Sequence, residues 1–214
     1  MNRAALRLLP PIRLLNVMSA CAQSHALMTI ITAAIISLSA LPANSATLEA
    51  QLTACLACHG ANGTSVIPEV PSLGGQPVFY LTVQLLMFRD KLRIVEPMNQ
   101  AMQGLKDDDL RNMAAHLAKL PPPEPSGDPI DAGRMEHARA LIEQHRCNFC
   151  HQGNYSGEQN VPRLAGQRED YLVKALREYK NNTRRGYDAA MADVLYQLGD
   201  EQILDLAYFL SRLR

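Results

Sequence analysis

Apolar side chains recur at helical spacing along most of the chain after residue 46. The stretches that predict helices are, in order, residues 77–93, 106–120, 132–146, 168–182 and 199–213. No stretch alternates between apolar and polar residues as a half-buried strand would. Two of the helices open on acidic residues, at Asp107 and Asp200, which suits the partial positive charge at a helix start. The pattern therefore predicts an all-α fold.

The same sequence unit occurs twice along the chain, which predicts two domains in tandem. Paired positions lie 91 to 93 residues apart. They are Cys55, Cys58 and His59 with Cys147, Cys150 and His151, then Pro71 and Gln76 with Pro162 and Gln167, and finally Met98 with Met191. Residues 121–129 separate the units and hold four prolines in their first five positions, as a stiff, extended linker does. We therefore expect domains over residues 47–120 and 130–214.

Residues 1–46 have the features of an export signal. A stretch with Arg3, Arg7 and Arg13 precedes a 16-residue apolar run over 26–41, and small residues follow the run. The run is shorter than the roughly 20 apolar residues of a membrane span. A cleaved signal and an uncleaved membrane anchor both stay open, and either one predicts a periplasmic protein.

Charge and core composition narrow the classes of function. The chain has 21 basic and 21 acidic side chains, and its formal charge is −3 without residues 1–46, so no nucleic-acid partner is predicted. Four Phe, seven Tyr and no Trp leave few large side chains for two cores. Domains of about 80 residues are marginal on side chains alone. We therefore expect a group other than protein to complete each core.

Cys-x-x-Cys-His is the attachment signature of c-type haem, and it occurs twice in this chain. Two cysteines three positions apart lie on one helical turn, so both thiols can reach the vinyl groups of one porphyrin. The histidine that follows projects toward the iron from the same face. The predicted covalent sites of two haem c groups are Cys55, Cys58, Cys147 and Cys150, and the predicted iron ligands are His59 and His151.

Three other interpretations of the cysteine pairs stay open. A thioredoxin-like dithiol needs a βαβ context, which the helical pattern does not provide. A zinc site would not explain the histidine after each pair or the methionine repeated downstream. Two structural disulfides would suit an exported protein. Haem explains the three repeated features together.

Methionine is the predicted second axial ligand of each iron. Met98 and Met191 occupy the same place in the two units, and Met98 follows Pro97 in a predicted loop just before a helix. The nearest rival, Met102, aligns with Leu195 and therefore has no methionine counterpart. Histidine or an open position is the alternative at each iron.

Other histidines are weaker candidates for the iron. His116 aligns with Phe209, which predicts a helix-packing residue, and His137 and His145 have no counterpart in the first unit. A histidine and a methionine together raise the reduction potential of a haem and leave no vacancy for oxygen or peroxide. We therefore expect electron transfer and no catalytic residues.

With these motifs the chain resembles the tandem dihaem class I cytochromes c, the cytochrome c4 group, over roughly residues 47–214. The resemblance rests on the paired Cys-x-x-Cys-His motifs, the methionines and the Pro-x-Leu-x-Gly-Gln segments that begin at Pro71 and Pro162. It implies three main helices per domain around a haem with one exposed edge. It also implies that the two domains pack face to face, so that an electron can pass between the haems.

The resemblance also implies roles outside the ligand set. In this family a proline carbonyl accepts a hydrogen bond from the axial histidine, which assigns Pro71 to His59 and Pro162 to His151. Two arginines near the methionines, Arg93 and Arg185, are candidate partners of the haem propionates. The alternative is that both are ordinary exposed arginines.

The expected function is to carry single electrons between a quinol-oxidising complex or a dehydrogenase and a terminal oxidase. The partners would be redox proteins, with membrane association through the N-terminus if residues 1–46 stay attached. The alternatives are a fixed haem subunit of a larger oxidoreductase and a dihaem enzyme, such as a peroxidase or a sulfur-compound dehydrogenase. An enzyme needs an open or unusual iron site, and the matched methionines argue against one.

Overall fold

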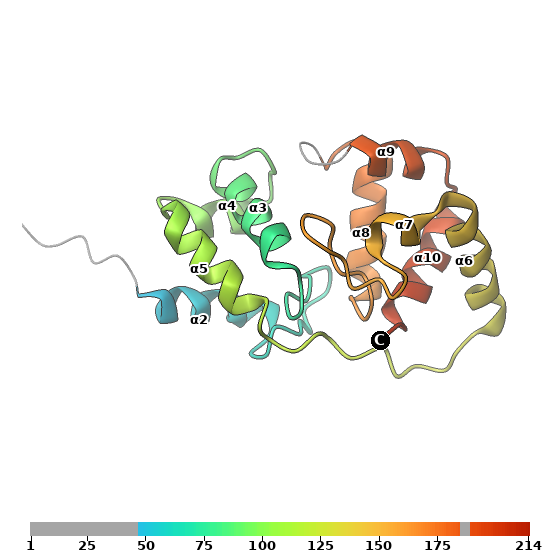
Figure 1. Cartoon of the computed structure of the whole chain (residues 1–214), viewed down its shortest axis with the longest axis horizontal. Coiled ribbons are helices and arrows are strands. Elements are labelled where there is room, and N and C mark those ends of the chain that lie inside the picture. The colour runs from blue at the N-terminus through green and yellow to red at the C-terminus, as the bar shows by residue number, and fades with distance from the viewer. Residues whose placement is uncertain (1–46, 185–188) are drawn as a thin grey trace, which may run out of the picture. The chain divides into compact units, whose positions relative to one another are not determined.

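The computed structural model describes residues 47–184 and 189–214, so the expected export signal over 1–46 and Arg185 lie outside the described residues. The first half contains α2 (Leu48–His59), α3 (Val78–Arg89), α4 (Glu96–Met102) and α5 (Asp107–Leu117). The second half contains α6 (Ala132–His145), α7 (Cys147–His151), α8 (Glu169–Lys180), α9 (Ala189–Tyr196) and α10 (Asp200–Ser211), as Figure 1 shows. The expected all-α class is confirmed.

Extended structure is minimal in the described ranges. One isolated bridge joins Glu158 to Val161, and no named strand occurs there. None of the described helices combines the length and the apolar character that crossing a membrane requires.

Each half builds its own hydrophobic core, and we call these halves domain 1 and domain 2. In domain 1, α5 packs against α2 and α3, and α4 packs against α3. In domain 2, α10 packs against α6 and α8, and α9 packs against α8. Equivalent positions of the paired helices α5 and α10 are fully buried, as at Leu110 and Ile203. The repeat in the sequence is therefore a repeat in the packing.

The five helices expected from apolar spacing are present, with shorter ends. The helix expected over 77–93 ends at Arg89, and Lys91 then adopts a left-handed φ of 55°. The helix expected over 168–182 ends at Lys180, and Asn182 adopts a φ of 52°. Left-handed residues stop helices because the next amide can no longer bond back four residues. The short α4 and α9 follow these two breaks.

The proline-rich linker is anchored at several points instead of hanging free. The Ser126 amide donates to the Ser211 carbonyl at 3.0 Å. The Tyr208 hydroxyl donates to the Pro129 carbonyl at 3.1 Å and accepts from the Asp131 amide at 2.7 Å. On the domain 1 side, a Cβ at Gly74 would lie 2.0 Å from the Pro121 carbonyl oxygen, so only glycine allows this approach.

An ion pair in domain 2 predicts a stability that depends on pH. Burial disfavours the ionised Asp205 carboxylate, but hydrogen bonds from Arg134 Nε at 2.8 Å and His137 Nδ1 at 2.6 Å hold its pKa below the ordinary value. Because the folded pKa is depressed, this contribution is present above about pH 4 and is lost as the pH falls through the folded pKa. We expect Asp205→Asn to lower the free energy of unfolding by about 1–2 kcal/mol at pH 7, with the difference shrinking below pH 4.

Urea titration at pH 7, 4 and 3 measures this effect. The control is Asp108→Asn, which removes an exposed pair with Arg111 and should change the free energy of unfolding by less than about 0.5 kcal/mol. An Asp205→Asn deficit that is the same at pH 3 as at pH 7 would contradict the assignment.

Candidate functional site

The two Cys-x-x-Cys-His motifs sit in different helical settings. The first forms the last five residues of the continuous helix α2, whereas the second forms α7, which a left-handed Arg146 separates from α6. Both helices end at the histidine, where the next residue has positive φ: 87° at Gly60 and 70° at Gln152. A Cβ at Gly60 would lie 1.9 Å from the Thr64 carbonyl oxygen. This reversal brings the chain back toward the proline segment.

Each motif histidine is buried and held by the proline carbonyl that the resemblance implied. His59 Nδ1 lies 2.8 Å from the Pro71 carbonyl oxygen, and His151 Nδ1 lies 3.0 Å from the Pro162 carbonyl oxygen. Because a carbonyl only accepts, Nδ1 carries a proton in each ring, so Nε2 is the nitrogen left for a metal in the neutral imidazole. Burial lowers the pKa of His59, and the bond to Pro71 offsets part of this. A neutral imidazole with a fixed ring is the form that ligates iron.

The four motif cysteines are free thiols in the structure. Cys55 and Cys147 are half-buried against the cores of their domains, and burial raises the pKa of each thiol. Cys58 and Cys150 are exposed. Each pair thus presents one inner and one outer sulfur on a single helical turn, which suits attachment to one porphyrin edge.

The expected loop around Met98 is wrong. Met98 lies in the first turn of α4 and Met191 lies in the first turn of α9. Pro97 does not prevent a helix here, because the first helical positions need no amide hydrogen. Both side chains are partly buried and pack on the same core as the inner cysteine of their domain. Their role as iron ligands stays a prediction.

Met102 has a different environment from Met98. Its side chain is 1% exposed and belongs to the core of domain 1, where its counterpart Leu195 is 2% exposed in domain 2. Methionine is an ordinary core residue in such a position. This contrast favours Met98 over Met102.

Asn99 was not predicted from the sequence, yet it holds the segment that carries Met98. Its side-chain oxygen accepts from the Val95 amide at 2.7 Å. Its side-chain nitrogen donates to the carbonyls of Phe88 at 2.7 Å and Arg93 at 2.8 Å. The counterpart in domain 2 is Ala192, so only a structure reveals this clamp.

The structural counterpart of Arg93 is Arg184, not Arg185. Arg93 donates its amide to the carbonyl of Met87, and Arg184 donates its amide to the carbonyl of Glu178, 91 residues further on. The sequence contains evidence for this pairing. The segments that begin at Pro71 and Pro162 are 91 residues apart, and Arg93 and Arg184 are separated by the same number. The separation rises to 93 at Met98 and Met191, so the two extra residues of the second unit follow Arg184.

Two arginines and two tyrosines, one of each from either domain, interact at the domain junction. Arg184 lies within 3.4 Å of the Tyr171 hydroxyl. Burial raises the pKa of Tyr80 to about 12. Burial also opposes ionisation of Tyr171, but Arg184 and Arg93 outweigh it and lower the pKa of Tyr171 to about 8. The buried guanidinium group of Arg184 and the partly buried one of Arg93 fit the carboxylates of haem propionates.

His116 and His137 do not join these sites. His116 is exposed, so the expected packing role is wrong: the helix face that buries Phe209 in domain 2 is open to solvent at this turn of α5. His137 pairs with Asp205. No cluster of three or more His, Cys, Asp or Glu side chains suited to a metal occurs in the described ranges.

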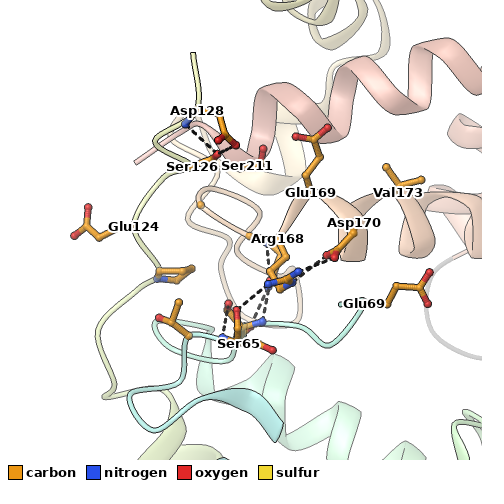
Figure 2. A pocket seen from close by; sticks show the side chains of 15 residues that line it. Ser65, Glu69, Glu124, Ser126, Asp128, Arg168, Glu169, Asp170, Val173 and Ser211 are labelled. Carbon is orange, nitrogen blue, oxygen red and sulfur yellow. Dashed lines mark hydrogen bonds and ion pairs between the residues drawn. The ribbon is translucent and has the colours of Figure 1, made fainter. Parts of the chain in front are cut away.

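The hollow in Figure 2 lies at the junction of the two domains and the linker. Its lining includes Glu69, Glu124, Asp128, Glu169 and Asp170, but no cysteine or histidine of the two motifs and no methionine. Arg168 lies in it, pairs with the neighbouring Asp170 and donates to the Ser65 carbonyl of domain 1 at 3.1 Å. We regard it as a solvated junction.

The residues present fit two haem c groups. Each domain has a free cysteine pair on one turn, a buried histidine whose Nδ1 is bonded to a proline carbonyl, and a methionine that packs on the same core. The donor set of imidazole nitrogen and thioether sulfur is that of an electron-transfer haem.

Comparison with known proteins agrees with this fit. The family model for cytochrome c matches residues 47–121 and 135–214. Cytochrome c4 of Pseudomonas aeruginosa is 29% identical over 173 residues, which are 77% of this chain and 86% of that protein. The crystal structure of reduced recombinant cytochrome c4 from Pseudomonas stutzeri has a TM-score of 0.69 at 25% identity and covers 79% of this chain and 100% of that one.

A relative with another name is also similar. The thiosulfate dehydrogenase electron acceptor of Thiomonas intermedia is 29% identical over 182 residues, which are 80% of this chain and 84% of that protein. Two family matches in tandem, together with the c4-type relatives and folds, decide the assignment. The chain belongs to the cytochrome c family, as a tandem dihaem member of the cytochrome c4 type that carries two covalently bound haem c groups and transfers electrons.

Proposed function

We propose that this protein is a periplasmic carrier that takes single electrons from a quinol-oxidising complex or a dehydrogenase and delivers them to a terminal oxidase. The observation that supports this most is the duplicated site: each domain combines a Cys-x-x-Cys-His turn, a proline-held histidine and a methionine on one core. Two matched sites suit storage and passage of electrons more than bond chemistry. The signal-like residues 1–46 support the export of the chain.

In this proposal the chain holds and tunes its haems with few residues. The cysteines Cys55, Cys58, Cys147 and Cys150 hold the porphyrins, and the iron ligands are His59 with Met98 and His151 with Met191. Bound haem supplies an iron that alternates between ferric and ferrous states.

The surroundings of the ligands support their role. The carbonyls of Pro71 and Pro162 orient the two imidazoles and raise their basicity. The thioether sulfurs favour ferrous iron and exclude external ligands. Burial of both histidines limits the solvent reorganisation that accompanies each electron.

Oxidation by membranes that contain a terminal oxidase tests the carrier role. We expect the purified dihaem protein to accept two electrons per chain, to be reoxidised rapidly by such membranes, and to bind neither carbon monoxide nor peroxide. Boiled membranes serve as the control. Binding of carbon monoxide to the unaltered protein would indicate an open iron and would favour the enzyme alternative.

A sulfur-compound dehydrogenase is a specific candidate for the electron donor. The observation that favours it is the similarity to a protein named thiosulfate dehydrogenase electron acceptor, which extends over 80% of this chain. We propose that such a dehydrogenase reduces this protein, either as a soluble donor or as a bound partner. Reduction by a thiosulfate dehydrogenase with thiosulfate, compared with reduction by a quinol-oxidising complex with quinol, decides between the two donors.

A further inference from the structure

Two buried glutamine side chains cross between the domains and bind the backbone on the other side. Gln167 of domain 2 accepts from the Ser72 amide at 2.8 Å and donates to the Ser72 carbonyl at 2.9 Å. Gln76 of domain 1 accepts from the Arg163 amide at 3.0 Å and donates to the Arg163 carbonyl at 2.9 Å. Gln76 is 6% exposed and Gln167 is 3% exposed, so these bonds form away from water.

The amides that the glutamines bind belong to the peptide groups that hold the axial histidines. The Ser72 amide and the Pro71 carbonyl are the two ends of one planar peptide group. His59 Nδ1 donates to that carbonyl at 2.8 Å, while the amide donates to Gln167. An unbroken path of hydrogen bonds therefore runs from the imidazole in domain 1 to a side chain of domain 2.

The reverse path exists as well. His151 Nδ1 lies 3.0 Å from the Pro162 carbonyl, and the amide of the same peptide group, at Arg163, donates to Gln76. Each domain thus supplies the glutamine that completes the support of the other domain's histidine. The two paths occupy equivalent places in the repeat, so the arrangement is reciprocal.

Hydrogen-bond cooperativity gives this path a chemical effect. An acceptor at a peptide N–H increases the negative charge on the carbonyl oxygen of the same group, because the peptide bond is delocalised. A more negative Pro71 oxygen strengthens the bond from His59 Nδ1 and makes Nε2 the better electron donor to iron. A better donor stabilises ferric iron more than ferrous iron and lowers the reduction potential.

We propose that Gln167 and Gln76 are positioning residues that set the reduction potential of the haem in the opposite domain, by polarising the peptide group that supports its axial histidine. This inference rests on the ligation by His59 and His151 proposed above. It makes the packing of the two domains a direct determinant of both potentials. A merely structural glutamine would instead change stability, with no preference for the distant haem.

Redox titration of Gln167→Leu is the main test. Loss of the acceptor should raise the potential of the domain 1 haem, so that its ratio of reduced to oxidised form increases about three- to tenfold at a fixed potential, or roughly 30 to 60 mV for a one-electron couple. The domain 2 haem, although it shares a domain with the mutation, should stay unchanged. Gln167→Glu keeps an acceptor oxygen and should leave the domain 1 potential at or below its original value.

A second measurement follows the path itself. In reduced protein with ¹⁵N-labelled histidine, Gln167→Leu should speed the solvent exchange of the His59 Nδ1 proton and leave that of His151 unchanged. The control is Arg168→Met, which removes the neighbouring cross-domain bond to the Ser65 carbonyl at 3.1 Å, visible in Figure 2, without touching either supporting peptide. It should move neither potential.

The mirror variant covers the case in which Gln167→Leu does not fold. Gln76→Leu should raise the potential of the domain 2 haem alone. Equal shifts at both haems, a shift at the mutated domain's own haem, no shift, or the same shift in Arg168→Met would each overturn the inference. Variants that still carry two electrons but show no shift in the potential of the opposite domain's haem would contradict this inference alone. An unaltered protein without histidine-ligated haem would contradict the proposed function.

Discussion

Replacing Met98 with alanine is expected to lower the reduction potential of the domain 1 haem by on the order of 0.1 V, within the range that axial ligands control. Alanine offers no donor, so water or an added ligand takes the sixth position, and the preference of the thioether for ferrous iron is lost. Oxidised protein should lose half of its weak near-infrared band from sulfur-to-iron charge transfer. Met191→Ala should do the same at the other haem, and the double variant should lose the band.

The matched control for Met98→Ala is Met102→Leu. Met102 is 1% exposed in the core of domain 1, and leucine conserves its volume, so we expect a small loss of stability and no change in spectrum or potential. Spectroelectrochemistry and carbon monoxide binding complete the measurement, since the opened haem alone should bind the gas. If Met98→Ala keeps the whole near-infrared band and Met102→Leu loses half of it, the sulfur ligand is Met102 and not Met98.

Removing one haem is expected to unfold one domain much more than removing the other. Cys55→Ser with Cys58→Ser prevents attachment in domain 1, where the core cluster of the described residues has nine buried apolar side chains. Cys147→Ser with Cys150→Ser does so in domain 2, where the corresponding cluster has sixteen. A core in a domain of this size rarely supplies more than about 3–5 kcal/mol. Domain 1 without its haem should therefore lose nearly all of its free energy of unfolding and become molten.

Urea unfolding, near-ultraviolet circular dichroism and binding of a hydrophobic dye measure this difference. Domain 1 should bind the dye strongly and lose its fixed aromatic environment while keeping part of its helical signal. Domain 2 should keep a cooperative transition, shifted to lower urea. Equal stability of the two haem-free domains would contradict the expectation.

The sequence predicts particular haem attachment residues because the chemistry of attachment is local. Cys55, Cys58 and His59 lie within five positions, and one helical turn is enough to place them together. The longer helices were also predictable, since α5 and α10 bury a regular apolar face. The loop expected at Met98 was wrong because a helix of seven residues has too few turns to produce a period.

Contacts between distant residues could not be predicted from spacing. Gln76 and Gln167 were visible as a repeated pair, but nothing in the sequence says that each binds the backbone 87 or 95 residues away. Arg185 was predicted instead of Arg184, because the separation between paired positions changes from 91 to 93 residues in the segment between α8 and α9. Asn99 has no counterpart in the second unit, so the repeat did not mark it.

The sequence alone determined that this is a duplicated, helical protein with two covalent haem sites. Each attachment motif needs only residues that are close along the chain, and it occurs in both copies of the repeat. The tertiary structure decided which groups surround those sites: the helical place of Met98, the junction around Arg184, and the exchange of glutamines between domains. The reason is physical. Covalent attachment depends on neighbours along the chain, whereas the strength of a ligand depends on neighbours in space, which only packing brings together.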